Sequence, residues 1–154
     1  VRSGLRYDYM MADKNDTFFT ELVQYHISGQ LKVAPEHMSD NALYYMGKPS
    51  FRLFCRLRKE FDKITRDAGL HTGIVPYFIS SHPGCRMSDM EKLAANPALK
   101  GIYMDQVQDF TPTPMTTSSV MFYSGLDPRT MKPVFTEHDP EKKKMQKSFF
   151  FKKK

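Results

Sequence analysis

The sequence predicts an α/β protein built on a parallel sheet, and three observations favour this class. Short apolar runs alternate four times with longer segments of helical periodicity. The helical segments start at capping residues and end near glycine or proline. The length of 154 residues suits one domain with its own core. Strands separated by helices pair in parallel through right-handed crossovers, so we expect an open sheet of four strands or part of a barrel.

The first half of the chain is expected to hold two strands and three helices. Residues 1–3 have the pattern of a strand end, and a capped helix follows over 16–29. A second short strand covers 31–34 and stops at Pro35. A short helix over 39–47 ends at a glycine, and the strongest apolar stripe predicts a long helix over 50–69.

The second half continues this alternation. The almost continuous apolar run at 73–79 is typical of a strand buried on both faces, although Pro76 cannot donate to a ladder. Ser88 and Glu91 are spaced as a capping box and predict the next helix. A further strand is expected over 103–110.

After that strand, the sequence predicts less regular structure. Residues 111–114 alternate threonine and proline and favour a rigid loop, and a short helix is expected before Gly125. Residues 126–135 are expected to be irregular or extended. Asp139 followed by proline predicts a last helix that runs to Phe151.

The charge is concentrated at one end of the chain. The net charge is +6, and residues 141–154 contain seven lysines and one glutamate, so the other residues sum to zero. Terminal charge runs are usually solvated, and no basic stripe crosses the body, so nucleic-acid binding is not expected. We therefore divide the chain into a core over 1–138 and a basic terminal helix or tail over 139–154.

Composition also predicts a compartment. No apolar run approaches the roughly 20 residues that a membrane span needs. The two cysteines cannot form a disulfide framework, and no signal segment opens the chain, so a cytoplasmic location is expected. Because Val1 opens the chain inside an apparent strand, we expect the chain to be part of a longer polypeptide.

Polar side chains gather after each predicted strand. The carboxyl ends of parallel strands meet at one edge of a sheet, which is where α/β proteins bind their ligands. The residues on this predicted rim are Arg2, Ser3, Arg6, Asp8, Glu36, His37, Ser80, Ser81, His82, Cys85, Gln108, Asp109, Thr111 and Thr113.

Three kinds of chemistry compete for the rim. A metal site could use Glu36, His37, His82 and Cys85, but the one close pair, His82 and Cys85, matches no zinc signature. Nucleophilic catalysis could use Cys85 or Ser81 beside His82, although no Gly-x-Ser-x-Gly elbow is present. The third reading is an anionic or zwitterionic small molecule held by arginines and backbone amides. For His82, a plain role in stabilising the turn stays open.

The sequence contains the strings Lys-Val-Ala-Pro-Glu-His at 32–37, Met-Gly-Lys-Pro at 46–49 and Ser-Ser-His-Pro-Gly-Cys at 80–85. These strings resemble the second half of a YgiQ-type radical SAM protein. They continue with Gln-Val-Gln-Asp-Phe-Thr-Pro-Thr-Pro at 106–114 and Gly-Leu-Asp-Pro-Arg at 125–129. The resemblance runs in order along nearly the whole chain. It implies strands three to six of a partial (β/α)6 radical SAM barrel.

The resemblance also implies a cofactor set. Such proteins hold a 4Fe-4S cluster through Cys-x3-Cys-x2-Cys and cleave S-adenosylmethionine to a 5'-deoxyadenosyl radical. Matching rim positions implies cofactor contacts by Glu36, Ser80, Gln108 and Phe110. The two cysteines here lie 30 positions apart, so this chain lacks the cluster motif and is expected to hold neither cofactor and to be inactive alone.

Other rim positions would meet the substrate or the cofactor carboxylate. These are Arg2, Arg6, His37 and His82. The missing half that carries the cluster is the expected partner, and the substrate is unknown. An unpaired sheet edge would make the chain self-associate. The alternative is a stand-alone α/β ligand-binding module without catalysis.

Overall fold

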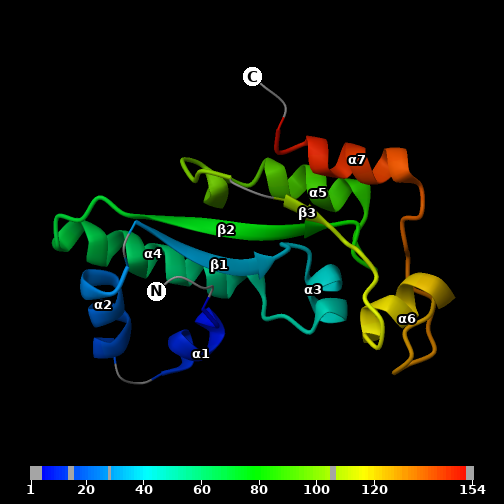
Figure 1. The fold of residues 1–154 in the computed structure, drawn as a ribbon, viewed down its shortest axis with the longest axis horizontal. Coiled ribbons are helices and arrows are strands. Elements are labelled where there is room, and N and C mark those ends of the chain that lie inside the picture. The colour runs from blue at the N-terminus through cyan, green and yellow to red at the C-terminus, as the bar shows by residue number, and fades with distance from the viewer. Residues whose placement is uncertain (1–4, 14–15, 28, 105–106, 152–154) are drawn as a thin grey trace.

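A computed structural model describes residues 5–13, 16–27, 29–104 and 107–151. Three parallel strands, β1 (Gln30–Glu36), β2 (Gly73–Ser80) and β3 (Val107–Asp109), form a sheet in the order β1-β2-β3 (Figure 1). Helices separate consecutive strands, so the predicted α/β class with a parallel sheet is confirmed. The strand expected at 1–3 lies outside the described residues. Leu5 forms an isolated parallel bridge with Val33 of β1.

Two strand boundaries differ from the sequence prediction. Pro35 does not stop β1, which continues to Glu36; the pairing register with β2 shifts between Val33 and Glu36. Pro35 and Pro76 lack N–H donors in this part of the ladder, and the irregular pairing accommodates them. The last strand is shorter than expected, because among the described residues only Val107–Asp109 pair with β2.

The helices largely follow the local sequence signals. They are α1 (Tyr7–Ala12), α2 (Asp16–Tyr25), α3 (Asp40–Met46), α4 (Phe51–Asp67), α5 (Met87–Ala94), a 3-10 turn (Pro97–Leu99), α6 (Thr117–Ser124) and α7 (Pro140–Ser148). Helix α1 was not expected. Ser50 caps α4 as predicted, but the cap of α5 differs: its carboxylate Asp89 accepts from the Arg86 backbone N–H at 2.9 Å.

One face of the sheet carries the core. The apolar stripe of α4 buries Phe54, Leu57 and Phe61 completely. Phe78 of β2 meets both the Phe51 ring, at a centroid distance of 6.4 Å, and the Phe150 ring beyond α7, at 6.0 Å. The start of α4 and the segment after α7 therefore pack on the same face of the sheet.

The opposite face of the sheet is more open. Lys32 and Gln108 are exposed and Tyr77 is half-buried, and the Lys32 ammonium lies 5.8 Å from the centre of the Tyr77 ring. Parallel sheets are normally covered on both faces, so this face is available for further contacts. Within the described residues, no helix is both long and apolar enough to cross a bilayer.

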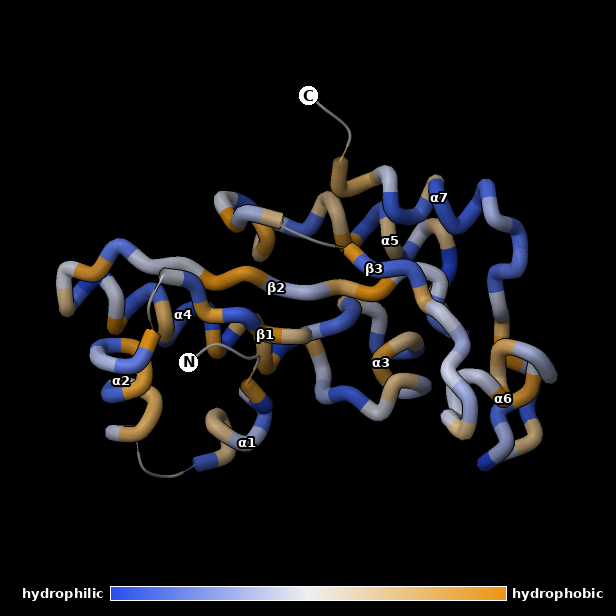
Figure 2. The backbone as a smooth tube through the Cα atoms, viewed as in Figure 1, coloured by the Kyte–Doolittle hydropathy of each residue, from blue (hydrophilic) through white to orange (hydrophobic). Residues whose placement is uncertain are grey.

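Helix α7 is mostly hydrophilic, yet it lies against the sheet. Figure 2 shows its polar colouring beside α5 and β3, and it contacts α5, β2 and β3. Asp139 caps it by accepting from the backbone N–H groups of Glu141 and Lys142 at 2.9 and 3.4 Å. Gln146 is its fully buried residue, and it anchors the helix to the end of β2.

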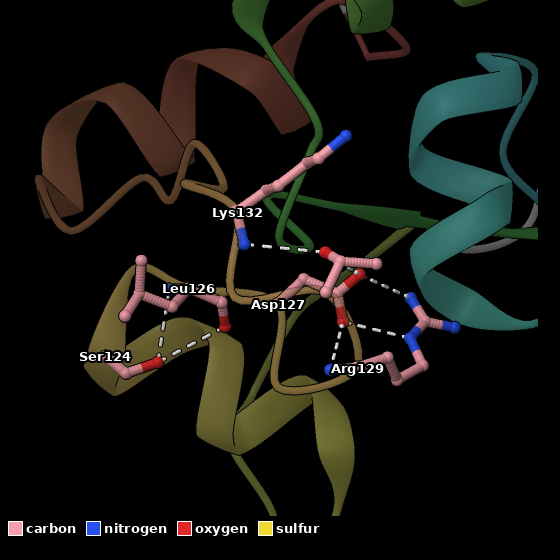
Figure 3. A network of polar contacts seen from close by, with 6 residues as sticks. Ser124, Leu126, Asp127, Arg129 and Lys132 are labelled. Carbon is pink, nitrogen blue, oxygen red and sulfur yellow. Dashed lines mark hydrogen bonds and ion pairs between the residues drawn. The ribbon is translucent and has the colours of Figure 1, made fainter.

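The loop after α6 is organised by one buried carboxylate (Figure 3). Asp127 accepts from the Arg129 Nε at 2.9 Å, the Arg129 backbone N–H at 3.1 Å and the Thr130 hydroxyl at 3.2 Å. These bonds, led by the Arg129 side chain, lower the pKa of Asp127. The Arg129 guanidinium lies 4.7 Å from the centre of the Tyr44 ring, so the loop is held against α3.

Candidate functional site

A cleft of about 340 Å³ opens where the three strands end. Its size lies in the range of about 300–1,000 Å³ that is typical of small-molecule sites. The lining residues come from every strand end and from the segments that follow: Glu36, Met46, Lys48, Ile79, His82, Gln108, Asp109, Phe110, Thr111, Thr113, Thr116 and Ser118. Of the predicted site residues, Glu36, His82, Gln108 and Phe110 share this cleft.

The wall of the cleft includes a pair of opposite charges. The Lys48 ammonium lies 3.1 Å from a carboxylate oxygen of Glu36, and both side chains are largely shielded from solvent. Glu36 has a backbone φ of 66°, in the left-handed region that is costly for a residue with a side chain. This conformation at the end of β1 leaves the carboxylate on the wall of the cleft, where it can accept a hydrogen bond from a ligand.

An imidazole with both ring nitrogens hydrogen-bonded also lines the cleft. The His82 Nδ1 donates to the Pro83 carbonyl at 2.9 Å, and its Nε2 accepts from the Ser118 hydroxyl at 2.8 Å. The Phe110 ring lies against the imidazole edge-on, with centroids 4.9 Å apart. Burial lowers the pKa of His82, so the neutral ring is favoured. His82 therefore both stabilises the turn, through Pro83, and lines the cleft.

Ser118 is a site residue that sequence reasoning missed. It is the second residue of α6 and lies 36 positions from His82 along the chain. No local motif links the two residues, because the contact joins α6 to the loop that follows β2. The cap of α6, Thr116, also lines the cleft.

Ser80 lies behind the cleft rather than on its wall. It is fully buried and donates to a carboxylate oxygen of Asp109 at 2.7 Å. Since Asp109 itself lines the cleft, Ser80 holds that carboxylate from below. Ser81, the next residue, has a φ of 59°. Its backbone N–H and hydroxyl both donate to the Gln146 Oε1, at 3.0 and 3.2 Å.

Cys85, one of the two residues weighed as a nucleophile, is buried and does not line the cleft. The His37 Nδ1 accepts from the Ser39 backbone N–H at 2.9 Å, which leaves its Nε2 to donate to the Cys85 sulfur at 3.2 Å. Burial raises the pKa of the Cys85 thiol to about 12 and lowers that of His37 to about 4. The imidazole beside this neutral thiol is that of His37, which donates to the sulfur and does not act as a base, so Cys85 is not an activated nucleophile.

His37 therefore does not reach the cleft, contrary to the sequence argument that placed it on the rim. Its ring is fully buried, because the chain turns inward immediately after the strained Glu36. In the described part of the chain, no three histidine, cysteine, aspartate or glutamate side chains are grouped to hold a metal ion.

The predicted site residue Arg6 does not line the cleft. Arg6 forms an ion pair with Asp8 at 2.6 Å and lies over the Tyr9 ring at 4.6 Å, with an exposed side chain. Short-range pairing on α1 thus occupies the guanidinium. Arg2 lies outside the described residues.

The sequence of the chain is similar to proteins and a domain that carry the names of uncharacterised families. Residues 105–153 match the family model of a domain of unknown function, DUF3362. A UPF0313 protein of Clostridium perfringens is 53% identical over 148 residues, which are 96% of this chain and 22% of that protein. A UPF0313 protein of Bacteroides thetaiotaomicron is 45% identical over 159 residues, covering 98% of this chain and 26% of that protein. The chain is similar to one segment of these proteins.

A UPF0313 protein of Clostridium botulinum gives the same picture, with 45% identity over 148 residues, 96% of this chain and 23% of that protein. The chain thus spans about a quarter of the length of the curated relatives that it matches. No solved structure matches it. The cleft residues accordingly belong to a segment that these relatives share within much longer polypeptides.

Proposed function

We propose that the chain forms the carboxyl-terminal part of the core of a cytoplasmic radical SAM enzyme, of the YgiQ type, and that its cleft holds part of S-adenosylmethionine. The observation that carries the proposal is the convergence of Glu36, Gln108 and Phe110 on one cleft at the carboxyl ends of parallel strands. This edge is where parallel α/β folds bind ligands. The extended similarity of the motifs to that family supplies the choice of cofactor.

The chemistry of the cleft suits the parts of this cofactor. S-Adenosylmethionine carries an ammonium, a carboxylate, ribose hydroxyls and an adenine ring. The Glu36 carboxylate can accept from the ammonium or a ribose hydroxyl, and the Lys48 ammonium can pair with the carboxylate. The exposed Gln108 amide and the Phe110 ring at the β3 end offer hydrogen bonds and a flat apolar surface for the adenine.

The chain's own residues do not fit the iron–sulfur cluster. Cys55 lies on α4, Cys85 is buried, and the triad Cys-x3-Cys-x2-Cys is absent from the sequence. We propose that the cluster ligands lie in the remainder of the longer polypeptide, which is the proposed partner of this chain. Reductive cleavage to the 5'-deoxyadenosyl radical, with a substrate of unknown identity, is accordingly proposed for the whole polypeptide and not for this chain alone.

The test uses the longer natural polypeptide that contains this chain, with its cluster reconstituted without oxygen. Equilibrium binding of S-adenosylmethionine is measured by calorimetry, and 5'-deoxyadenosine release is measured after adding dithionite. Glu36→Gln should raise the Kd at least about tenfold, or about 1.4 kcal/mol. The matched control is Glu91→Gln, an exposed glutamate on α5 that lies outside the cleft.

The outcomes separate the two candidate functions. Cofactor binding that depends on Glu36, together with release of 5'-deoxyadenosine, supports the enzyme. Binding without cleavage favours the non-catalytic ligand-binding module. A polypeptide with an intact cluster that does not bind the cofactor would overturn the proposal.

We further propose that the isolated chain self-associates. In the described part of the chain, Leu5 alone bridges the outer edge of β1, and the sheet face that carries Tyr77 and Gln108 is open. Light scattering should report a mass above 17.9 kDa at high concentration. A single monomeric species at that concentration would contradict this idea.

A further inference from the structure

We propose that Ser118 is an activated nucleophile, with His82 as its base, and that the cleft accepts small uncharged esters in an acyl-transfer reaction. This activity goes beyond the proposed function and does not depend on it. The observation behind it is geometric: the Ser118 hydroxyl and the His82 Nε2 lie 2.8 Å apart, and both residues line the cleft.

The imidazole is held in the form that a base requires. The Pro83 carbonyl accepts a hydrogen bond, so the His82 Nδ1 must carry the proton, and the lone pair lies on Nε2 toward Ser118. The Pro83 carbonyl plays the orienting role that a carboxylate plays in a serine hydrolase triad. The Phe110 ring packs against the imidazole and limits its rotation.

The surroundings of Ser118 favour attack on an uncharged ester. Thr111, Thr113 and Thr116 also line the cleft, so its wall includes uncharged polar residues besides the Glu36–Lys48 pair. Ser118 belongs to the first turn of α6, whose N-terminal backbone N–H groups carry partial positive charge. Negative charge that develops on the acyl oxygen near Ser118 would be stabilised by that turn.

The reaction balances without a further reagent. The Ser118 oxygen forms a bond to the acyl carbon while its proton moves to the His82 Nε2. The bond from that carbon to the alkoxide leaving group breaks, and the imidazolium returns the proton to the alkoxide. Water then attacks the acyl-serine with His82 again as base, which releases the acid and restores Ser118.

The test uses two probes on the purified protein. A fluorophosphonate is expected to form one covalent adduct, which fragment mass spectrometry locates on Ser118. Hydrolysis of 4-nitrophenyl acetate is followed by absorbance, and Ser118→Ala or His82→Asn should each lower the rate by about a hundredfold. The double variant should lose no more than either single variant, because the two residues act as a unit.

Ser124→Ala is the matched control, since Ser124 is an exposed serine on the same helix that lies outside the cleft. It should keep both labelling and hydrolysis. If Ser118→Ala or His82→Asn fails to fold by circular dichroism, the position of the adduct in the unmodified protein decides. An unlabelled Ser118, an adduct on another residue only, or hydrolysis no faster than in Ser118→Ala would overturn the proposal.

Discussion

Gln146 provides the sharpest test of how the cleft is supported from behind. Its fully buried Oε1 accepts from the Ser81 backbone N–H at 3.0 Å and from the Ser81 hydroxyl at 3.2 Å. The Cys85 thiol, 3.4 Å away, is a third neighbour of the same oxygen. Because Ser81 sits at the strained end of β2, immediately before His82, these bonds fix the loop that carries the imidazole.

The magnitude for Gln146→Met follows from these contacts. Methionine has a similar volume, so little cavity forms, but the buried Ser81 groups lose their acceptor at a cost of about 1–3 kcal/mol. Removing the Gln146 Nε2, a buried atom with no hydrogen-bond partner among the described residues, offsets part of that loss. We expect a net destabilisation of about 2 kcal/mol, which for a domain of this size lowers the Tm by about 4–8 °C.

Urea unfolding gives the free energy of unfolding, and amide hydrogen exchange reports the protection of the Ser81 N–H. Lys142→Met is the matched control, because Lys142 is exposed on the same helix and methionine forms helix about as well as lysine. The control should leave stability within about 0.5 kcal/mol of the parent. A Gln146→Met protein as stable as the control, with a still-protected Ser81 amide, would show that the hydrogen bonds to Gln146 do not hold the loop that carries His82.

Three further predictions concern residues around the loop after β2. Gly84→Ala should destabilise the protein by at least about 2 kcal/mol and lower its Tm, because Gly84 has a φ of +85° and an added Cβ would lie 2.4 Å from the Tyr45 ring; an unchanged Tm would show that Tyr45 moves aside freely. The Cys85 thiol, with its pKa of about 12 and full burial, should resist iodoacetamide at pH 8 until urea unfolds the chain, as mass spectrometry of the peptides would show; rapid alkylation of the folded protein would contradict its burial. The folded-state pKa of His37, about 4 against 6.5 in the unfolded chain, means that the unfolded chain binds more protons, so stability should fall as the pH drops from 6.5 to 4. That loss amounts to about 1.4 kcal/mol per pH unit from this group, and urea unfolding of His37→Asn should show a shallower dependence on pH; an equally steep dependence would place its origin in other groups.

The class of fold and the bounds of several helices could be predicted from the sequence alone. The signals that succeeded are local: Ser50 and Asp139 cap α4 and α7, and the apolar stripe of α4 faces the core. A cap depends on hydrogen bonds to residues two or three positions away, and helical periodicity depends on neighbours three or four positions away. Such signals can be read from any chain without knowledge of its partners in space.

Part of the candidate site was also predictable, because strand ends in a parallel sheet meet at one edge. That rule brought Glu36, His82, Gln108 and Phe110 to one cleft. It failed for His37, which follows Glu36 directly but turns inward to Cys85. The direction of a side chain after a strand depends on the backbone conformation there, and the positive φ of Glu36 has no signature in the sequence.

The hydrogen bonds that hold the residues of the cleft could be found only in the tertiary structure. Ser118 meets His82 across 36 positions, and Gln146 meets Ser81 across 65. Hydrogen bonds over such separations form because folding brings α6 and α7 to the loop after β2, and that arrangement results from the combined burial of many apolar groups. The sequence therefore determined which helices and strands exist, whereas the packing of those elements determined which of their polar side chains meet.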